Sequence, residues 1–422
     1  MFGRGLNPRP INKNRFQFLF RVEFLMNKNV YPSFLCLVLL LILSCASPLQ
    51  FDKTSSSDIS NWKSFRRDCQ NTAYDSSPIE TPNRLLWKYD TKKALKSSPI
   101  ILNKVIVIGS LDKRVFFINA LSGKNLSVQR VYSSVSTSAC GQTDVRRTTT
   151  RLGGDDATVY FGLDRGKETF FAQNLKTGKT LWEKKLGDLS SSPTLFGDKI
   201  FVGTSDGTLW ALNKTNGEKI WEFNTKSTIF STPACNGWSS SATDKEMIYF
   251  GSTDGYLYAL SSDSGSVKWK YKADGGIYSS PAIKNGMIFF GSVDGCLYAL
   301  NLTDSSLVWK FQTQADVYSS PAVTESLVYI GSNDYNMYAV NQQTGELIWK
   351  FKTEGLIHSS PIAVGDKLFF GSYDGNFYVL NRFTGKLLWK YQTKGMISSS
   401  PAYYDGKIYM ASEDGFLYCF GR

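Results

Sequence analysis

The sequence predicts an all-β protein, an eight-bladed β-propeller built from four-stranded antiparallel blades. Three observations predict this fold. A tripeptide recurs about every 40 residues, hydrophobic residues alternate with a period of two inside each repeat, and the composition favours strands and tight turns, with 14% aromatic residues and 35 glycines. A ring of repeats can absorb all 422 residues as one unit.

The recurring tripeptide is Ser-Ser-Pro or Ser-Thr-Pro, and self-similarity of this kind indicates a repeat architecture. It ends at Pro99, Pro193, Pro233, Pro281, Pro321, Pro361 and Pro401. The stretch Ser136-Thr137-Ser138-Ala139-Cys140 aligns with Ser231-Thr232-Pro233-Ala234-Cys235 and supplies an eighth copy. The spacing stretches to 48 residues between Pro233 and Pro281 and to 55 between Ser138 and Pro193.

One repeat shows how a blade is made. Residues 277–283 form a strand that ends at Asn285-Gly286, a hairpin turn pair. Residues 287–291, 296–301 and 307–313 follow as three more strands separated by polar turns. A single four-stranded blade cannot bury both of its apolar faces, so the blades are expected to stack on one another.

The last repeat contains only three strands, the third of which spans residues 416–420. Residues 84–91 near the other end carry the sequence of a fourth strand, RLLWKYDT. We therefore expect this N-terminal strand to complete the last blade and to close a ring that spans residues 84–422. Closure removes the open sheet edges that would otherwise be exposed.

Residues 1–45 are expected to be an export signal. The apolar run 31–44 is too short to span a membrane and has the length of a signal-peptide core. Ile42-Leu43-Ser44-Cys45 resembles a bacterial lipobox, which implies lipidation of Cys45 and a lipid anchor in the cell envelope, at the outer membrane. A plain cleaved signal and an uncleaved anchor remain as alternatives. Met26 is the expected start of translation, because a 30-residue stretch before the apolar run is unusually long.

Two segments separate Cys45 from the ring. Residues 46–61 are polar and rich in serine, which predicts a flexible tether. Residues 62–83 contain Trp62, Phe65 and Tyr74, and this aromatic content predicts a lead-in segment packed on the ring rather than a disordered tail.

Charge and cysteine pattern argue against two classes of function. The formal net charge is +12, and six basic residues and one acid in segment 1–45 account for +5 of it. The remainder forms no long basic run, so no nucleic-acid partner is expected. The seven cysteines show no CxxC pair and no metal-ligand spacing, so neither a zinc site nor a disulfide framework is predicted.

A second pattern repeats in the outer half of each unit: Ala, then Gly six residues on, then Trp four further. It matches fully at Ala172/Gly178/Trp182, Ala211/Gly217/Trp221, Ala259/Gly265/Trp269 and Ala339/Gly345/Trp349. The pattern resembles the pyrroloquinoline-quinone (PQQ)-type propeller repeat over residues 84–422, and residues 62–74 resemble the lead-in of bacterial members of that family. The resemblance implies that a Trp docks between neighbouring blades, which assigns this role to Trp87, Trp182, Trp221, Trp269, Trp309, Trp349 and Trp389. The first repeat departs from the pattern, with Arg130 expected at the Trp position after Ala120.

Eight aspartates recur at one position of the repeat and are candidates for metal binding: Asp112, Asp164, Asp206, Asp254, Asp294, Asp334, Asp374 and Asp414. Each follows a strand and most precede Gly, where Asp stabilises a turn. One aspartate per blade spreads them around a ring, too far apart to share a cation. No metal site is therefore predicted.

The single histidine, His358, occupies the position of Phe230, Tyr278 and Tyr318 in other repeats. An aromatic residue replaced by another flat side chain indicates packing rather than catalysis. No catalytic residue is predicted.

The PQQ-type family includes quinoprotein dehydrogenases, whose resemblance implies adjacent cysteines over the quinone, calcium ligands and a catalytic Asp. No Cys-Cys pair occurs in this sequence. We therefore expect no cofactor and no enzyme activity, but a monomeric propeller lipoprotein that acts as a protein-binding scaffold. It is similar to the propeller lipoprotein of the outer-membrane β-barrel assembly machinery. A PQQ-dependent dehydrogenase or cofactor-binding propeller, and a surface adhesin or ligand sensor, remain as alternatives.

The two insertions in the repeat fall at the same place, after the first strand of a unit. First-to-second-strand turns emerge on one face of a propeller, so both insertions are expected to rise from one rim. Insertions of this kind often mark the binding face. Arg146, Arg147 and Arg151 in the first and Trp238 in the second are residue types enriched at interface hot spots, and we assign them to partner binding. Neutral surface loops are the alternative.

Overall fold

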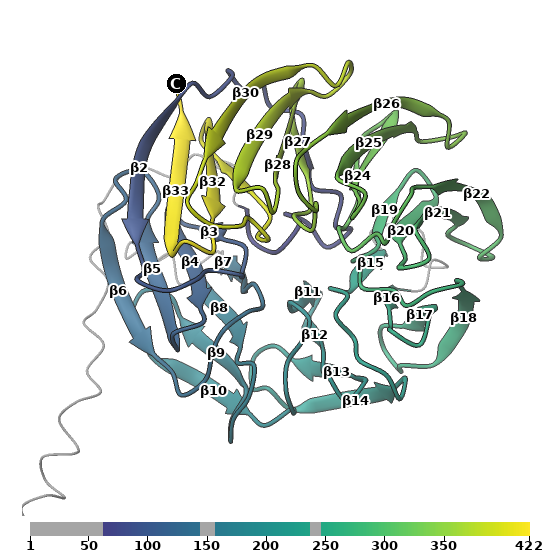
Figure 1. The fold of residues 1–422 in the computed structure, drawn as a ribbon. Helices are drawn as coiled ribbons and strands as arrows, with labels where there is room; N and C mark the ends of the chain where they lie inside the picture. The colour runs from purple at the N-terminus through teal and green to yellow at the C-terminus, as the bar shows by residue number, and fades with distance from the viewer. Residues whose placement is uncertain (1–61, 144–156, 237–245) are drawn as a thin grey trace, which may run out of the picture. The chain divides into compact units, whose positions relative to one another are not determined.

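The computed structural model describes residues 62–143, 157–236 and 246–422. These residues form eight antiparallel blades around a central axis, which confirms the eight-bladed propeller (Figure 1). Within the described ranges there are strands and turns but no helix, and so no helix long and apolar enough to cross a membrane. Residues 1–61, with Cys45, and the insertion residues Arg146, Arg147, Arg151 and Trp238 lie outside the described residues.

Each blade consists of four strands that succeed one another from the axis outward (Figure 1). The innermost strands are β3 (Ile100–Leu102), β7 (Cys140–Thr143), β11 (Thr194–Phe196), β15 (Ala234–Asn236), β19 (Ala282–Lys284), β23 (Ala322–Val323), β27 (Ile362–Val364) and β31 (Ala402–Tyr404). The second strands are β4 (Val105–Ser110), β8 (Ala157–Gly162), β12 (Lys199–Gly203), β16 (Met247–Gly251), β20 (Met287–Gly291), β24 (Leu327–Gly331), β28 (Lys367–Gly371) and β32 (Lys407–Ala411). The third strands are β5 (Arg114–Asn119), β9 (Phe170–Asn174), β13 (Thr208–Asn213), β17 (Tyr256–Ser261), β21 (Cys296–Asn301), β25 (Asn336–Asn341), β29 (Asn376–Asn381) and β33 (Phe416–Gly421). The outer strands are β6 (Asn125–Arg130), β10 (Thr180–Lys184), β14 (Lys219–Asn224), β18 (Val267–Lys272), β22 (Leu307–Gln312), β26 (Leu347–Lys352), β30 (Leu387–Gln392) and, in the eighth blade, β2 (Arg84–Asp90).

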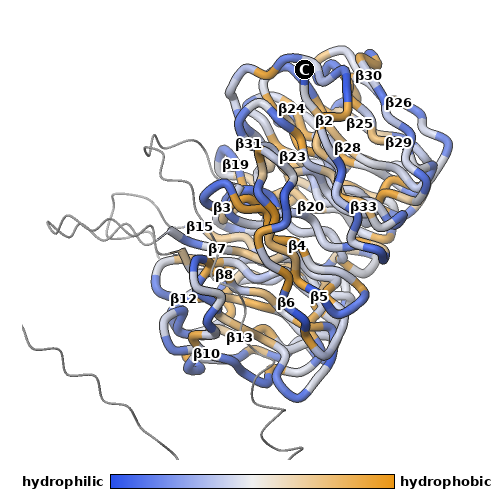
Figure 2. Tube along the Cα trace, turned by 90° about the vertical axis from the view of Figure 1, so that its left-hand side faces the viewer, coloured by the Kyte–Doolittle hydropathy of each residue, from blue (hydrophilic) through white to orange (hydrophobic). Residues whose placement is uncertain are grey.

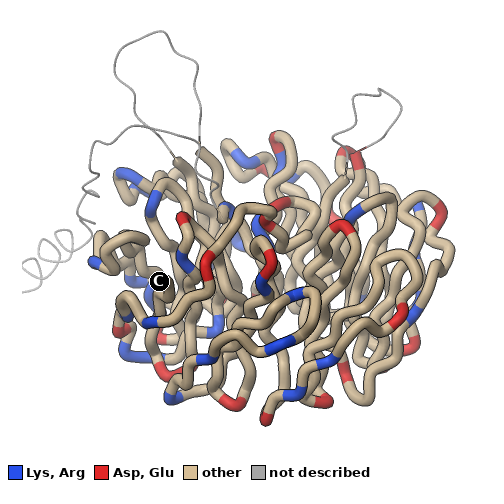
Figure 3. The backbone as a smooth tube through the Cα atoms, turned by 90° about the horizontal axis from the view of Figure 1, so that it is seen from above, with Lys and Arg blue, Asp and Glu red and all other residues tan. Residues whose placement is uncertain are grey.

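The core lies between the blades. Every residue of β20 and all but the last of β21 are buried, because blades cover both faces of these strands. A strand buried on both faces is apolar throughout rather than alternating. In Figure 2 the apolar residues lie inside the ring and the polar ones concentrate at turns and outer edges. Figure 3 shows basic and acidic residues interspersed, without a region of one sign.

Outer-strand tryptophans join consecutive blades. The Nε1–H group of Trp309 in the fifth blade donates to the carbonyl oxygen of Gln342 in the sixth, at 3.0 Å. Its indole packs against Gly345, in the turn that follows Gln342. A Cβ atom added to Gly345 would come within 2.7 Å of Trp309 Cδ2. The same packing against a glycine pairs Trp87 with Gly123, Trp182 with Gly217, Trp221 with Gly265 and Trp349 with Gly385.

Trp269 and Trp389, like Trp87, are only partly buried, whereas Trp182, Trp221, Trp309 and Trp349 are buried. In the blade after Trp269 the Gly position is taken by Ser305, which adopts the left-handed conformation with φ of 61°. In the blade after Trp389 the third and outer strands, β33 and β2, come from opposite ends of the sequence and share no turn. Trp389 instead packs against Phe377 and Phe420.

The register predicted for the first blade was wrong. The structure pairs Phe117 with Ser127 at the positions that Ala and Trp occupy in other blades, three residues earlier than Ala120 and Arg130. The cause is Gly123, whose φ of 68° makes the turn between β5 and β6 and which receives the indole of Trp87. The Ala–Gly–Trp spacing is therefore kept, with Phe and Ser in place of Ala and Trp.

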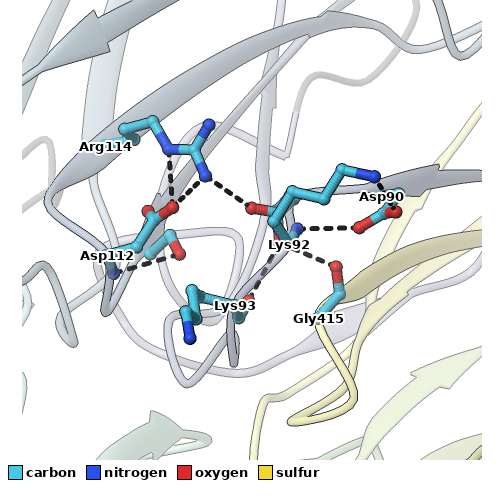
Figure 4. Close-up of polar contacts among 8 residues, drawn as sticks. Asp90, Lys92, Lys93, Asp112, Arg114 and Gly415 are labelled. Carbon is cyan, nitrogen blue, oxygen red and sulfur yellow. Dashed lines mark hydrogen bonds and ion pairs between the residues drawn. The ribbon is translucent and has the colours of Figure 1, made fainter.

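The predicted ring closure is confirmed, because β2 pairs antiparallel with β33, with Trp87 opposite Cys419. Figure 4 shows how the chain then crosses to the first blade. Thr91 donates its backbone N–H to Gly415 in the eighth blade at 2.9 Å. Arg114 in the first blade donates to the Thr91 carbonyl at 2.9 Å and forms an ion pair with Asp112. The closing strand is thus held from both neighbouring blades.

Candidate functional site: the central channel

The repeated tripeptide lines the channel with hydroxyl groups. One side chain per blade does so, from the second residue of the tripeptide or its equivalent: Ser98, Ser138, Ser192, Thr232, Ser280, Ser320, Ser360 and Ser400. The backbone N–H of Ser320 donates to the hydroxyl of Ser360 in the next blade at 2.8 Å. Bonds of this kind join seven of the neighbouring pairs, including Ser400 to Ser98 across the closure. The alignment predicted for the second repeat was wrong by one residue, because Ser138 takes the place of Thr232 in these contacts and not that of Pro233. The serine belt therefore ties the blades together around the axis.

The first serine of the tripeptide works inside its own blade. Ser359, for example, accepts the backbone N–H of Gly371 in the neighbouring strand at 3.0 Å. No role for either serine was predicted, although the recurrence of the pair about every 40 residues could have indicated one. Their positions explain why the pattern needs two hydroxyls in succession.

The lead-in segment, residues 62–83, fills one end of the channel. Arg66 is 2% exposed, and its guanidinium donates to the carbonyl oxygens of Pro321 and Pro361 in two blades. The Asn71 amide donates to the carbonyls of Thr232 and Pro281 at 3.1 Å each. These carbonyls lie just before the innermost strands, where no further strand on the axis side can satisfy them. Burial lowers the pKa of Arg66 to about 9, so the group remains a cation at neutral pH.

The backbone of the lead-in pairs with the innermost strands in turn. It contacts six blades, through Trp62 with Ile101, Lys63 with Gly141, Cys69 with Cys235, Gln70 with Ile283, Thr72 with Val323 and Ala73 with Ala363. The short strand β1 (Tyr74–Asp75) then runs parallel to β27 as a fifth strand of the seventh blade. The lead-in is therefore an integral part of the ring's inner wall.

The lead-in therefore acts as a plug of the channel. Beside this plug the channel holds a cavity of about 470 Å³, with Phe65 of the lead-in in its wall. One position per blade, two residues before the belt, forms the mouth. Four consecutive blades place Phe230, Tyr278, Tyr318 and His358 there, and the other four place Ser398, Lys96, Ser136 and Ser190. The mouth is thus aromatic on one half and polar on the other.

The aromatic half is a continuous row of ring contacts, stacked at both ends and edge-to-face between Tyr278 and Tyr318. The ring centroids of Phe230 and Tyr278 lie 5.0 Å apart, and those of Tyr318 and His358 lie 4.9 Å apart. His358 Nδ1 is 2.9 Å from the Tyr373 hydroxyl, and its Nε2 has no hydrogen-bond partner in the part of the chain that the structure describes. Burial lowers the pKa of His358 below its usual value, so the imidazole is neutral at pH 7.

The recurring aspartates lie in the turns between second and third strands. Asp374 accepts the backbone N–H of Asn376 at 2.8 Å, the N–H of Glu354 at 3.0 Å and the hydroxyl of Tyr378 at 2.7 Å. Burial, and then the Asp374 carboxylate, raise the pKa of Tyr378, which stays protonated as the donor. Asp254, Asp294, Asp334 and Asp414 make the same pair of bonds with their own turn and tyrosine. Their carboxylates are therefore occupied within each blade.

The channel residues do not fit the quinone and calcium of the PQQ enzymes. Across residues 62–143, 157–236 and 246–422, no three His, Cys, Asp or Glu side chains come together in a metal-binding group. At the mouth, Asp164 accepts the hydroxyls of Ser134 and Ser136, and Asp188 lies 3.9 Å from Arg165. We therefore derive no reaction step through these groups.

Two family models match the chain. The model described as beta-alanine-activating enzyme, beta-propeller, matches residues 156–367, and the model described as outer membrane protein assembly factor BamB matches residues 338–420.

Curated relatives come from two functional classes. Outer membrane protein assembly factor BamB of Burkholderia pseudomallei is 23% identical over 149 residues, which cover 32% of this chain and 37% of that protein. Quinoprotein alcohol dehydrogenase PedH of Pseudomonas putida is 27% identical over 154 residues, which cover 33% of this chain and 25% of that protein. The chain thus spans 37% of the length of the first relative and 25% of that of the second.

Solved structures show the same fold. BamB from Moraxella catarrhalis superposes with a TM-score of 0.65 at 17% identity, covering 80% of this chain and 99% of that chain. A quinohemoprotein alcohol dehydrogenase from Comamonas testosteroni gives a TM-score of 0.69 at 13% identity, covering 86% and 81%. The chain belongs to the propeller family described as beta-alanine-activating enzyme, beta-propeller, whose model spans half of it, and is a PQQ-like β-propeller that resembles BamB.

Proposed function

We propose that this chain is a non-catalytic, lipid-anchored propeller of the bacterial cell envelope that binds a protein partner in outer-membrane protein assembly. The likeness to BamB in sequence and in family model supports the assembly role. The observation that carries the scaffold role is the position of the lead-in beside the roots of both insertions. The carbonyl oxygen of Lys63 accepts the N–H of Gly141 in β7 at 2.8 Å, and the carbonyl oxygen of Cys69 accepts the N–H of Cys235 in β15 at 2.7 Å.

These two innermost strands end at Thr143 and Asn236, immediately before the insertions. Both roots are therefore held by the strands of their own blade and by the lead-in. Rigid support of a binding surface reduces the entropy that is lost when a partner docks. Arg146, Arg147, Arg151 and Trp238 are the residues that we assign to the partner on this face, because Arg and Trp are frequent interface hot spots.

The experiment replaces both insertions with the Asn285-Gly286 turn of the fifth blade. We expect the unfolding midpoint to stay nearly constant, since surface loops tolerate changes in length, and the crosslinked partner to be lost from intact cells. The matched control is Arg165→Ala, an 85% exposed side chain in a second-to-third-strand turn at the opposite rim. Recovery of the same partner by the shortened protein at unchanged affinity would refute the proposal.

The second candidate is a quinoprotein dehydrogenase, favoured by the likeness to PedH and by the cavity beside the plug. The purified protein should give no saturable heat when it is titrated with pyrroloquinoline quinone and calcium at micromolar concentrations. A stoichiometric complex with alcohol-dependent dye reduction would instead establish the enzyme.

A further inference from the structure

Two cysteines meet where the lead-in crosses the fourth blade. The backbone N–H of Cys235 donates to the carbonyl of Cys69 at 2.7 Å, and the Cys235 thiol approaches the same oxygen at 3.4 Å. The Cys235 side chain lowers the pKa of the Cys69 thiol below its usual value. Cys235 is wholly buried, whereas Cys69 is partly exposed.

This juxtaposition differs from the surroundings of the other described cysteines. In the second blade Gly141 takes the position of Cys235 and donates its N–H to Lys63, and the preceding Cys140 pairs with Ser64 of the lead-in. Cys296 and Cys419 are buried in the fifth and eighth blades. Among the described residues, the lead-in therefore offers a thiol to a blade at one place.

We propose that Cys69 and Cys235 form a disulfide bond that fastens the lead-in covalently to the fourth blade. The bond rests on the export that is part of the proposed function, because disulfides persist in oxidising compartments of the cell envelope. It goes beyond that function, since it concerns how the plug of the channel is held.

The backbone geometry suits the bond. The Cys235 Sγ atom lies 3.4 Å from the Cys69 carbonyl oxygen, and the backbone hydrogen bond of 2.7 Å holds the two residues beside each other. A disulfide joins residues whose Cα atoms lie roughly 4.4–6.8 Å apart, so it requires neighbouring backbone segments of this kind.

The chemistry needs a disulfide-bearing oxidant, such as oxidised glutathione or a thiol oxidase of the envelope. The Cys69 thiolate, which is accessible and more acidic than an ordinary thiol, attacks a sulfur of the oxidant and releases one thiolate. Cys235 then loses its proton to a thiolate and attacks the Cys69 sulfur, which releases the second thiol. Two electrons and two protons pass from the cysteine pair to the oxidant, whose disulfide is reduced to two thiols.

The disulfide would restrict the movement of the lead-in, which plugs the channel. Cys69 lies between Arg66 and Asn71, whose side chains satisfy the axial carbonyls. A covalent bond at this point limits how far the lead-in can move from the channel. It also closes a long loop of the unfolded chain, which stabilises the folded state.

Peptide mapping of the full-length protein tests the bond directly. The protein is oxidised with glutathione disulfide, free thiols are alkylated, and the chain is cut with trypsin without reduction. We expect residues 68–84 and 227–245 to appear as one linked peptide that lacks two hydrogen masses. Reduction should lower the unfolding midpoint by roughly 5 °C, and Cys69→Ser should abolish this shift.

Cys140→Ser is the matched control, since it changes the other innermost-strand cysteine beside the lead-in and should retain both the linked peptide and the shift. Full alkylation of Cys69 and Cys235 after oxidation, when the protein is unfolded in denaturant without reduction, would overturn the proposal. The mapping needs no partner, so loss of the scaffold function and absence of the disulfide are separate results.

Discussion

Gly385 of the seventh blade lies directly against the indole of Trp349 in the sixth, so closely that a Cβ atom would come within 2.7 Å of Trp349 Cδ2. Gly385 has a φ of 69°, and the indole Nε1–H donates to Arg382 in the same turn at 2.9 Å. The glycine of the repeat therefore serves the turn and the seam between blades together, and this makes the pattern of Gly and Trp sensitive to single substitutions.

Gly385→Ala should lower the free energy of unfolding by about 2–4 kcal/mol, because it combines a left-handed backbone with an overpacked seam. Gly406→Ala is the control. Gly406 has a φ of 71° but nothing within 4 Å of an added Cβ, so that the backbone cost of about 1 kcal/mol should act alone. Chemical denaturation of both variants measures the difference. Equal losses would show that the seam contributes nothing.

His358→Phe should remove a pH dependence of stability. Burial keeps the pKa of His358 below its usual 6.5, so the unfolded chain binds a proton that the folded chain excludes. The stabilising contribution is therefore complete above pH 6.5 and is lost as the pH falls from there toward the folded pKa. Urea denaturation at about pH 7.5 and about pH 5.5 should show a smaller loss for the variant than for the wild type. Phe fills the same position in the fourth blade as Phe230, and an unchanged loss would contradict this account.

Deletion of residues 84–91 should leave the eighth blade open. Removing β2 exposes the edge of β33 and the apolar face behind it, so we expect the protein to aggregate. Deletion of residues 46–60 should be tolerated. Size-exclusion chromatography and thermal unfolding of the two deletion variants distinguish the outcomes, and a soluble, cooperatively folding protein without residues 84–91 would disprove the closure by β2.

Cys45→Ser should abolish lipid attachment. The prediction rests on the apolar run 31–44 and on the adjoining Ile42-Leu43-Ser44. Cells labelled with a fatty-acid probe should tag the wild-type protein and leave the variant untagged. A tag of equal intensity on the variant would eliminate the lipid anchor at this residue.

Much of the fold could be predicted because its signals are local and repeated. Four strands per unit follow from alternation and turn pairs within about 40 residues, and closure followed from the strand that the eighth repeat lacks. The register of the first blade could not be predicted in this way. That register depends on the packing of Gly123 against Trp87. Trp87 lies in β2 of the eighth blade, which contacts the first blade only because the ring closes.

In the channel, too, repeated features could be predicted and features that occur once could not. The number of blades, the position of the closing strand and the recurrence of the Ser-Ser-Pro tripeptide could be predicted from the sequence alone. The path of the lead-in depends on tertiary contacts, in which Arg66 reaches Pro321 and Pro361, 255 and 295 residues away, and Cys69 meets Cys235. A contact made once between distant segments leaves no period in a single sequence. It forms because the ring brings the innermost strands of all eight blades around one axis, where their unpaired carbonyl groups must find a donor.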